Sequence, residues 1–283
     1  MLDNIEDAAL DFDYKAFRKR QQQKALQDFW QGLSLWRIWL MLAWQDIYLR
    51  YRRSIIGPLW ITLSMAISVY SMGFLYAHLW HVALNEYFPF LVTGMLSWAL
   101  IAIIITEGTD VYLLSASLIR QIKLPYTLYV HRIIMRNFMI FGHNLLVMLP
   151  IYVFFHQDFQ FSLAYFTFLP GLFFLYVNSI LYANILGISC ARYRDLGQIV
   201  KSLIQVMFFM TPIMWKWTIL PQQYQSYVFL NPFFNFIEII REPLLGLYPD
   251  IRSYIFVGLA TVIGIILNAL LFARYRARIV YWL

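Results

Sequence analysis

Charged residues are scarce in this chain. Of its 283 residues, 13% are Asp, Glu, Lys or Arg, whereas a soluble domain carries about 25%. Hydrophobic residues make up 61%, and the mean hydropathy is +0.61. So few charges cannot cover the surface of a protein in water, which excludes a soluble enzyme or a soluble binding domain. We therefore expect an integral membrane protein.

Cysteine and the common metal- and nucleotide-binding patterns are also missing. The single cysteine, Cys190, excludes an intramolecular disulfide and a cysteine-based metal cluster. Neither the phosphate-binding pattern G-x-x-x-x-G-K-[ST] nor an H-E-x-x-H or H-x-x-E-H pair occurs. A membrane glycosyltransferase would need a clustered acidic site for a metal or nucleotide, and the sequence shows none. We expect this chain to have no catalytic residue and to bind no metal and no cofactor.

The expected membrane spans carry almost no charge near their centres. An ion-coupled carrier is expected to place ionisable residues there, and many such carriers are built from inverted repeats. The sequence shows neither feature. The energy for transport is therefore expected to come from a separate ATPase subunit that binds ATP and Mg²⁺. The alternative is a channel or ion-coupled carrier that needs no ATPase.

Six apolar segments match the ~20 residues that a helix needs to cross the hydrocarbon core. Thr211-Pro212 and two lysines interrupt the fifth, which makes it the weakest. A further apolar stretch, 227–240, is broken by Asn231-Pro232 and predicts a re-entrant or interfacial piece. The expected fold is therefore all-α, with six transmembrane helices. Their predicted ranges are 57–80, 88–107, 133–155, 163–188, 199–220 and 253–273.

Positive charges are distributed unevenly between the two sides of these spans. Nineteen of the 22 Lys and Arg residues fall in the N-terminal stretch, the C-terminal tail and the two loops on the same side. Cytoplasmic loops carry an excess of Lys and Arg, so we expect both termini to be cytoplasmic. The net charge of +7 is then expected to anchor the protein on an anionic leaflet rather than to bind nucleic acid.

Two stretches on the expected cytoplasmic side have apolar stripes at helical spacing. One, within 33–54, predicts an amphipathic helix that lies in the membrane interface. The other, within 110–125, either lies on the bilayer or docks into a groove of a partner. Residues 1–32 form a tail with no assigned role, and 55–283 form the membrane domain. The two stripes consist of Leu33, Trp36, Leu40, Ala43 and Ile47, and of Val111, Leu114, Leu118 and Ile122.

The interfacial stretch ends in a cluster of positive charge. Arg50, Arg52 and Arg53 are followed by Gly57-Pro58 and then by an apolar run. Proline is favoured in the first turn of a helix, so Gly57-Pro58 predicts a sharp corner between the interfacial helix and the first span. The arginines can serve there as anchors on an anionic leaflet.

Several blocks of the sequence resemble one family of membrane proteins. The stretch WQDIYLRYRRSIIGPLWITLSMAI (44–67) resembles the opening of ABC-2 type permeases that export polysaccharides, especially O-antigen. The resemblance covers about residues 33–275. Later blocks that resemble the family, in the expected order, are FLVTGMLSW (90–98), LIRQIKLP (118–125), ARYRDLGQIV (191–200), TPIMW (211–215) and NPFFNFIEIIREPLLG (231–246).

The resemblance implies a non-catalytic permease subunit of an ABC transporter in a bacterial inner membrane. It implies a homodimer driven by two cytoplasmic ATPase subunits. The substrate would be a polysaccharide, O-antigen first, linked to undecaprenyl pyrophosphate and threaded through a channel at the dimer interface. Within the family, the alternative is an exporter of capsule, teichoic acid or another lipid-linked substrate.

The resemblance also implies roles for individual segments. The helix at 110–125 would couple the permease to the ATPase, and residues 221–250 would form short periplasmic re-entrant helices near the exit. The arginine cluster and its tyrosine would meet the lipid pyrophosphate at the cytoplasmic entrance. The implied coupling residues are Val111, Leu114, Leu118, Arg120, Ile122 and Lys123, and the implied pyrophosphate residues are Arg50, Tyr51, Arg52 and Arg53.

Aromatic residues are abundant, with 20 Tyr, 24 Phe and 10 Trp. Their rings can stack on the apolar faces of sugars, and many weak contacts suit a polymer that must slide. Most of the rings are expected to face lipid or to form interfacial belts. Near the expected exit, Glu238, Arg241 and Glu242 are spaced for a local ion-pair network. The residues expected to line a glycan channel are Tyr70, Phe74, Tyr76, Trp98 and Trp215.

Overall fold

The computed structural model describes residues 19–283, except residues 53, 55, 58 and 156–161. The described residues form α-helices and short 3-10 helices joined by turns, and they include no strand. Five helical stretches among them are long and apolar enough to cross a membrane. These features confirm the prediction of an all-α polytopic membrane protein.

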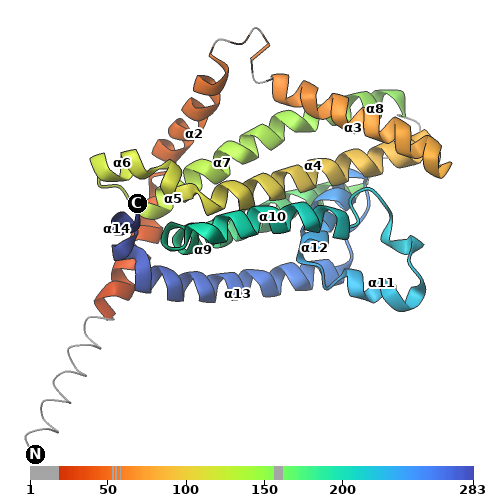
Figure 1. Ribbon diagram of the computed structural model, residues 1–283. Helices are drawn as coiled ribbons and strands as arrows, with labels where there is room; N and C mark the ends of the chain where they lie inside the picture. The colour runs from red at the N-terminus through yellow and green to blue at the C-terminus, as the bar shows by residue number, and fades with distance from the viewer. Residues whose placement is uncertain (1–18, 53, 55, 58, 156–161) are drawn as a thin grey trace, which may run out of the picture.

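The five candidate spans lie side by side in one bundle (Figure 1). Three of them are extended at one end by short helical segments. The spans are α3 (Leu59–Trp80), α4 (Leu84–Thr109), α7 (Tyr126–Asn144) with η1 (Leu145–Val147) and α8 (Met148–Phe154), η3 (Leu163–Thr167) with α9 (Phe168–Arg192), and α13 (Ile251–Tyr275) with η5 (Arg276–Arg278) and α14 (Ile279–Trp282).

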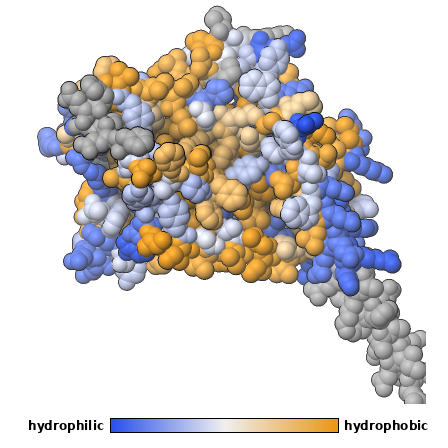
Figure 2. Space-filling view, turned by 180° about the vertical axis from the view of Figure 1, so that it is seen from behind, coloured by the Kyte–Doolittle hydropathy of each residue, from blue (hydrophilic) through white to orange (hydrophobic). Residues whose placement is uncertain are grey.

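Short helices mark the two ends of the bundle. At one end, together with α14, lie α5 (Val111–Leu114) and α6 (Ala116–Gln121), and we call this the α5–α6 end (Figure 1). At the other lie α11 (Gln222–Val228) and α12 (Pro232–Leu244), which we call the α11–α12 end. Hydrophobic side chains cover much of the face seen in Figure 2, and hydrophilic ones gather toward its two ends. This distribution suits a protein whose middle lies in lipid.

The spans differ in how much of their surface the chain itself covers. In the most apolar window of each helix, 67% of α4 is buried, compared with 22% of α13 and 11% of α3. α4 is therefore a central helix, whereas α3 and α13 present most of their apolar surface outward. In a membrane protein this surface is available to lipid or to another protein chain.

The fifth predicted span, 199–220, takes a different form in the structure. The helix is α10 (Arg194–Met210), which ends ten residues earlier than predicted and packs against α4 and α9. Its 17 residues extend about 25 Å, less than the ~30 Å hydrocarbon core. Thr211 is extended because Pro212 disfavours a helical residue before it. The described residues thus form five full-length spans and one shorter helix in place of the sixth.

α12 is a short helix that is buried in the bundle rather than exposed on its surface. It packs against α4, α9 and α13. Asn231 caps it by accepting a hydrogen bond from the backbone N–H of Phe233 at 3.0 Å, and Pro232 occupies its first turn. With 13 residues it is too short to cross the membrane. α11 and α12 thus lie in the 221–250 region, where the sequence predicted short re-entrant helices.

The amphipathic stretch forms α2 (Trp36–Tyr51), which packs against α7 through Trp39, Ala43 and Ile47. Of the stripe predicted to face lipid, Leu33 and Trp36 are 40% and 50% exposed, whereas the protein covers Ala43 and Ile47. The buried positions instead recur every four residues from Trp39, and protein rather than lipid covers them. Aromatic side chains are favoured at membrane interfaces. Those on the exposed surface of α2 are Trp36, Trp44 and Tyr48.

Asp28 joins three segments that are distant in the sequence. It lies in the helix formed by residues 19–34, and its side chain is fully buried. The carboxylate accepts hydrogen bonds from the backbone N–H groups of Tyr126 and Thr127, each at 3.1 Å, and from Arg276 Nε at 2.7 Å. The first N–H groups of a helix lack partners within it, so Asp28 caps α7 from outside. Residues 19–32, which the sequence analysis left unassigned, are part of the fold.

We expect Asp28→Asn to lower the free energy of unfolding by about 1–3 kcal/mol, because it removes a buried charge that Arg276 and the α7 N-terminus stabilise. Asp250→Asn is the matched control. Asp250 also caps a helix, α13, and pairs with Arg252 at 2.6 Å, but this pair is more exposed and is worth only ~0–1 kcal/mol. Thermal unfolding in detergent measures both variants. An equal loss of stability in the two would contradict the assignment.

Candidate functional site

The C-terminal end of α2 presents positive charge outward. Arg50 and Arg52 are exposed, and Tyr51 between them is half-buried. The fourth predicted pyrophosphate residue, Arg53, lies outside the described residues. α2 runs at an angle to the long helices of the bundle, and its C-terminal end stands away from them (Figure 1). Two guanidinium groups are therefore accessible to an anionic group outside the bundle.

Between α2 and α3, the described part of the predicted Gly57-Pro58 corner is a turn at Gly57. Gly57 has a left-handed backbone with φ of 64°, and its N–H donates to Ser54 Oγ at 3.1 Å. The next residue, Pro58, lies outside the described residues. Glycine adopts this conformation without the steric penalty that other residues incur. The turn therefore fixes the direction in which the chain leaves α2.

A network of opposite charges joins α2 to α7, and α7 to α4. Arg132 on α7 makes two hydrogen bonds to Asp46 on α2, at 2.6 and 2.9 Å. Arg136 contacts Asp46 at 3.4 Å and also pairs with Glu107 on α4, which accepts a further hydrogen bond from Asn137 at 2.6 Å. This network was not predicted from the sequence, where the arginines were interpreted only as topology signals. Their spacing of four residues on one helix was the available sign.

The predicted coupling helix is divided into α5 and α6. The chain breaks at Ser115 and becomes extended at Ile122, so 110–125 is not one continuous helix. Val111 is buried and Leu118 is half-buried, so these two predicted coupling residues offer little or no outer surface. The other four are exposed at the α5–α6 end and combine apolar and cationic groups. They are Leu114, Arg120, Ile122 and Lys123.

The three predicted channel aromatics on α3 have different surroundings. The Tyr70 hydroxyl donates to the Val147 carbonyl at 2.5 Å, so it is used within the chain. The Tyr76 ring stacks on Trp80 with their centroids 5.0 Å apart. Phe74 is 58% exposed. Of the three, Phe74 therefore has the largest exposed fraction available to a substrate, lipid or second chain.

The other two predicted channel aromatics lie elsewhere. Trp98 is buried between Phe208 and Phe233, with centroid distances of 5.7 and 5.6 Å, so it is a core side chain of the single chain. Trp215 is half-buried and lines a cleft of about 470 Å³ together with residues of α10 and α11. The structure thus does not bring the five aromatics together within one chain.

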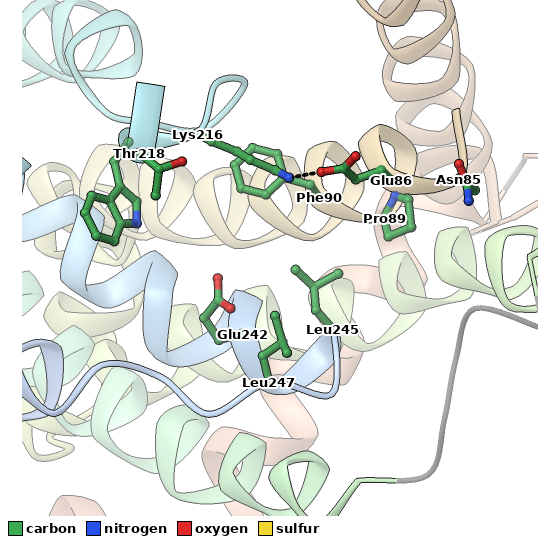
Figure 3. Close-up of a pocket in the computed structure, with 10 residues that line it drawn as sticks. Asn85, Glu86, Pro89, Phe90, Lys216, Thr218, Glu242, Leu245 and Leu247 are labelled. Carbon is green, nitrogen blue, oxygen red and sulfur yellow. Dashed lines mark hydrogen bonds and ion pairs between the residues drawn. The ribbon is translucent and has the colours of Figure 1, made fainter. Parts of the chain in front are cut away.

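A second cleft, of about 320 Å³, opens at the α11–α12 end (Figure 3). An ion pair between Lys216 and Glu86 lies on one side of it, and the Lys216 ammonium is 5.9 Å from the centre of the Phe90 ring. The carboxylate of Glu242, from α12, points into the cleft from the other side (Figure 3). Trp217 also lines it. The cleft combines aromatic, acidic and basic groups in a volume at the low end of ligand pockets.

Arg241 is the largest polar side chain in the interior at this end. It is 1% exposed, donates to the Pro212 carbonyl at 2.8 Å, and lies 4.3 Å from the centre of the Phe90 ring. The predicted ion-pair network with Glu238 and Glu242 is therefore replaced by contacts with the preceding loop and α4. Glu238 Oε2 and Arg241 Nε are buried without hydrogen-bond partners. Burial, and secondly the charge of Glu242, raises the pKa of Glu238 to about 7.

Glu238 predicts a pH dependence of stability. Its pKa is about 4.5 when exposed and about 7 in the fold, so the folded protein binds the proton more tightly. The contribution of Glu238 to stability is then fully present below about pH 4.5, and about 3 kcal/mol of it is lost as the pH rises through 7. Glu238→Gln should flatten this fall, whereas Glu86→Gln at the exposed ion pair should keep it. Unfolding measured from pH 5 to 8 tests this, and an unchanged slope in Glu238→Gln would contradict it.

The described residues offer several surfaces for binding. They contain no group of three or more His, Cys, Asp or Glu side chains placed to hold a metal ion. They do offer an exposed cationic corner at the end of α2, a protruding α5–α6 segment, and two clefts at the α11–α12 end. Such surfaces can bind anionic, protein and carbohydrate partners at opposite ends of a membrane bundle.

Comparison with known proteins identifies relatives over most of the chain. No family model matches it. Two curated proteins from Klebsiella pneumoniae, both named O-antigen export system permease protein RfbA, are 22% and 23% identical to it over 240 and 238 residues. Each alignment covers 83% of this chain and 89% of the relative.

Proposed function

This chain belongs to the ABC-2 type family of polysaccharide export permeases, and from that membership we propose that it carries a lipid-linked polysaccharide, O-antigen first, across a bacterial inner membrane. The observation that carries the proposal is the similarity to two O-antigen export permeases along 83% of the chain. In this proposal the chain is not catalytic. A separate ATPase binds ATP and Mg²⁺ and supplies the energy.

The charge distribution supports an orientation with both termini in the cytoplasm. α5, α6 and α14, which belong to segments rich in Lys and Arg, gather at one end of the bundle (Figure 1). α11 and α12 lie at the other end, in a region with few positive charges. An excess of positive charge is typical of the cytoplasmic side. The α5–α6 end then faces the cytoplasm, and the α11–α12 end faces the periplasm.

The α5–α6 segment is the proposed contact with the ATPase. Leu114 and Ile122 are 61% and 49% exposed, and Arg120 and Lys123 beside them are exposed. Apolar and cationic groups on a short protruding segment suit a groove on a partner protein. Two such chains and two ATPases would form the complete transporter, with the glycan passing between the two permease copies.

The cationic corner of α2 is the proposed entrance for the lipid carrier. A guanidinium group forms strong, charge-assisted hydrogen bonds with phosphate oxygens. Arg50 and Arg52 are exposed beside Tyr51, and the residues after them lead directly into the first span. The undecaprenyl chain would then lie in the surrounding lipid while its pyrophosphate contacts the corner.

The α11–α12 end is the proposed exit for the glycan. Its two clefts carry rings that can stack on sugars, Trp215 and Trp217, and the second also carries Glu242 and Lys216. Tryptophan presents a large apolar face to a sugar. Weak contacts of this kind would hold a polymer without stopping it.

Reconstitution tests the proposal most simply. The chain is expressed with its ATPase, placed in proteoliposomes and supplied with undecaprenyl-pyrophosphate-linked glycan. We expect glycan to cross the membrane only when ATP is hydrolysed. Transport that persists when the ATPase is inactivated would instead favour a channel or an ion-coupled carrier. Transport of a different lipid-linked polymer in preference to O-antigen would change the substrate but not the class.

Charge reversal at Arg52 tests the entrance. We expect Arg52→Glu to lower export at limiting substrate by about tenfold, because it replaces a charge-assisted hydrogen bond to phosphate with repulsion. Arg37→Glu is the control, since Arg37 is also exposed and lies near the start of the same helix. Membrane insertion and dimer formation are measured in parallel. Normal export by a correctly inserted Arg52→Glu dimer would refute a pyrophosphate role.

A further inference from the structure

A chain of buried hydrogen bonds links α5 to two membrane spans. The Tyr112 hydroxyl on α5 donates to Asn184 Oδ1 on α9, and Asn184 Nδ2 donates to Asn268 Oδ1 on α13 at 2.7 Å. All three side chains are buried, with Tyr112 and Asn184 fully so. The segment that breaks at Ser115 therefore has an outer part, α6, and an inner part, α5, that is bonded into the bundle.

The buried position of these hydrogen bonds makes them costly to lose. Asn184 lies eight residues before the end of α9 at Arg192, which is about 12 Å along the helix. Asn184 is fully buried, so water does not replace a partner that its side chain loses. If α5 moved alone, the Asn184 oxygen would lose its hydroxyl donor in a buried site.

Close packing ties α5 to α9 at the same place. A Cβ atom added to Gly187 would lie 2.3 Å from Val111 Cγ1 and 3.1 Å from the Tyr112 ring. One turn of α9 earlier, a Cβ on Gly108 at the end of α4 would meet Ala183 at 3.0 Å. α5 therefore rests directly on α9, and a displacement of α5 must be followed by α9 or must break both the contact and the hydrogen bond.

We propose that Tyr112, Asn184 and Asn268 are positioning residues that transmit movement of the α5–α6 segment to α9 and α13. The inference rests on the proposed function, in which an ATPase contacts the exposed side chains of this segment. ATP-driven movement of the ATPase displaces α6 and with it α5. The hydrogen bonds and the Gly187 contact then carry α9 and α13 along.

Two other hydrogen bonds provide a matched comparison. Tyr182 Oη donates to the Ala260 carbonyl at 2.8 Å, and Asn178 Nδ2 donates to Thr261 Oγ1 at 2.8 Å. Both join α9 to α13, as the Asn184–Asn268 bond does, but neither includes a residue of α5. Tyr182→Phe therefore removes a tyrosine hydrogen bond between the same two spans and leaves the connection to α5 intact.

The experiment measures the number of glycan chains exported per ATP hydrolysed by the reconstituted complex. Tyr112→Phe removes only the hydroxyl, and Asn268→Ala removes the far end of the chain of hydrogen bonds. We expect each single variant to retain ATP hydrolysis and to lower the number of glycan chains exported per ATP by about fivefold or more. The double variant should lower this number no further than either single variant does. Tyr182→Phe should keep the wild-type ratio. Thermal unfolding of every variant separates this effect from a loss of stability.

Two results would overturn the inference. One is a wild-type ratio in Tyr112→Phe and Asn268→Ala. The other is an equal fall in Tyr182→Phe, which would indicate a general need for α9–α13 packing. If Tyr112→Phe does not assemble with the ATPase, the ratio measured for Asn268→Ala tests the inference by itself, because this variant leaves α5 unaltered. The proposed function is judged separately, by whether the wild-type complex exports glycan when ATP is present.

Discussion

The scarcity of water in a bilayer is the constraint on which this structure depends. A polar group carried into the bundle loses its hydrogen bonds to water, so a partner within the protein stabilises it. The chain meets this constraint with a few specific contacts: Asp28 at the start of α7, Arg136 between two carboxylates, and Arg241 on the Pro212 carbonyl. Each joins elements that are distant in sequence. The polar groups that are hardest to place in a membrane are therefore the ones that fix how its helices pack.

These contacts give the two ends of the bundle different character. At the α5–α6 end, ion pairs join α2 to α7 and α7 to α4, and residues 19–34 are held through Asp28. Opposite charges in partly buried pairs favour a defined geometry. At the α11–α12 end, Arg241 is held mainly by a carbonyl and the Phe90 ring. In the proposed transporter, the first end receives force from the ATPase and the second releases the glycan.

Local sequence features predicted most of the fold. Hydropathy located five spans, and the Asn231-Pro232 pair marked a break in an apolar stretch, because these signals act within one or two turns of a helix. The end of α10 was also signalled, by Pro212, but apolar residues beyond it extended the predicted span. Long-range contacts could not be predicted. Trp98 is buried, and Arg241 bonds to a carbonyl instead of a glutamate. Both outcomes depend on which helices become neighbours in the fold.

A structure of this chain bound to its ATPase and to lipid-linked glycan would show whether glycan passes between two copies of the chain. We expect two copies of the chain, with α6 of each seated in a groove of an ATPase. We expect glycan density between the copies, running from the corner near Arg52 toward the α11–α12 end. A single copy with no ATPase contact at α6, or glycan bound away from the surface between two copies, would contradict it.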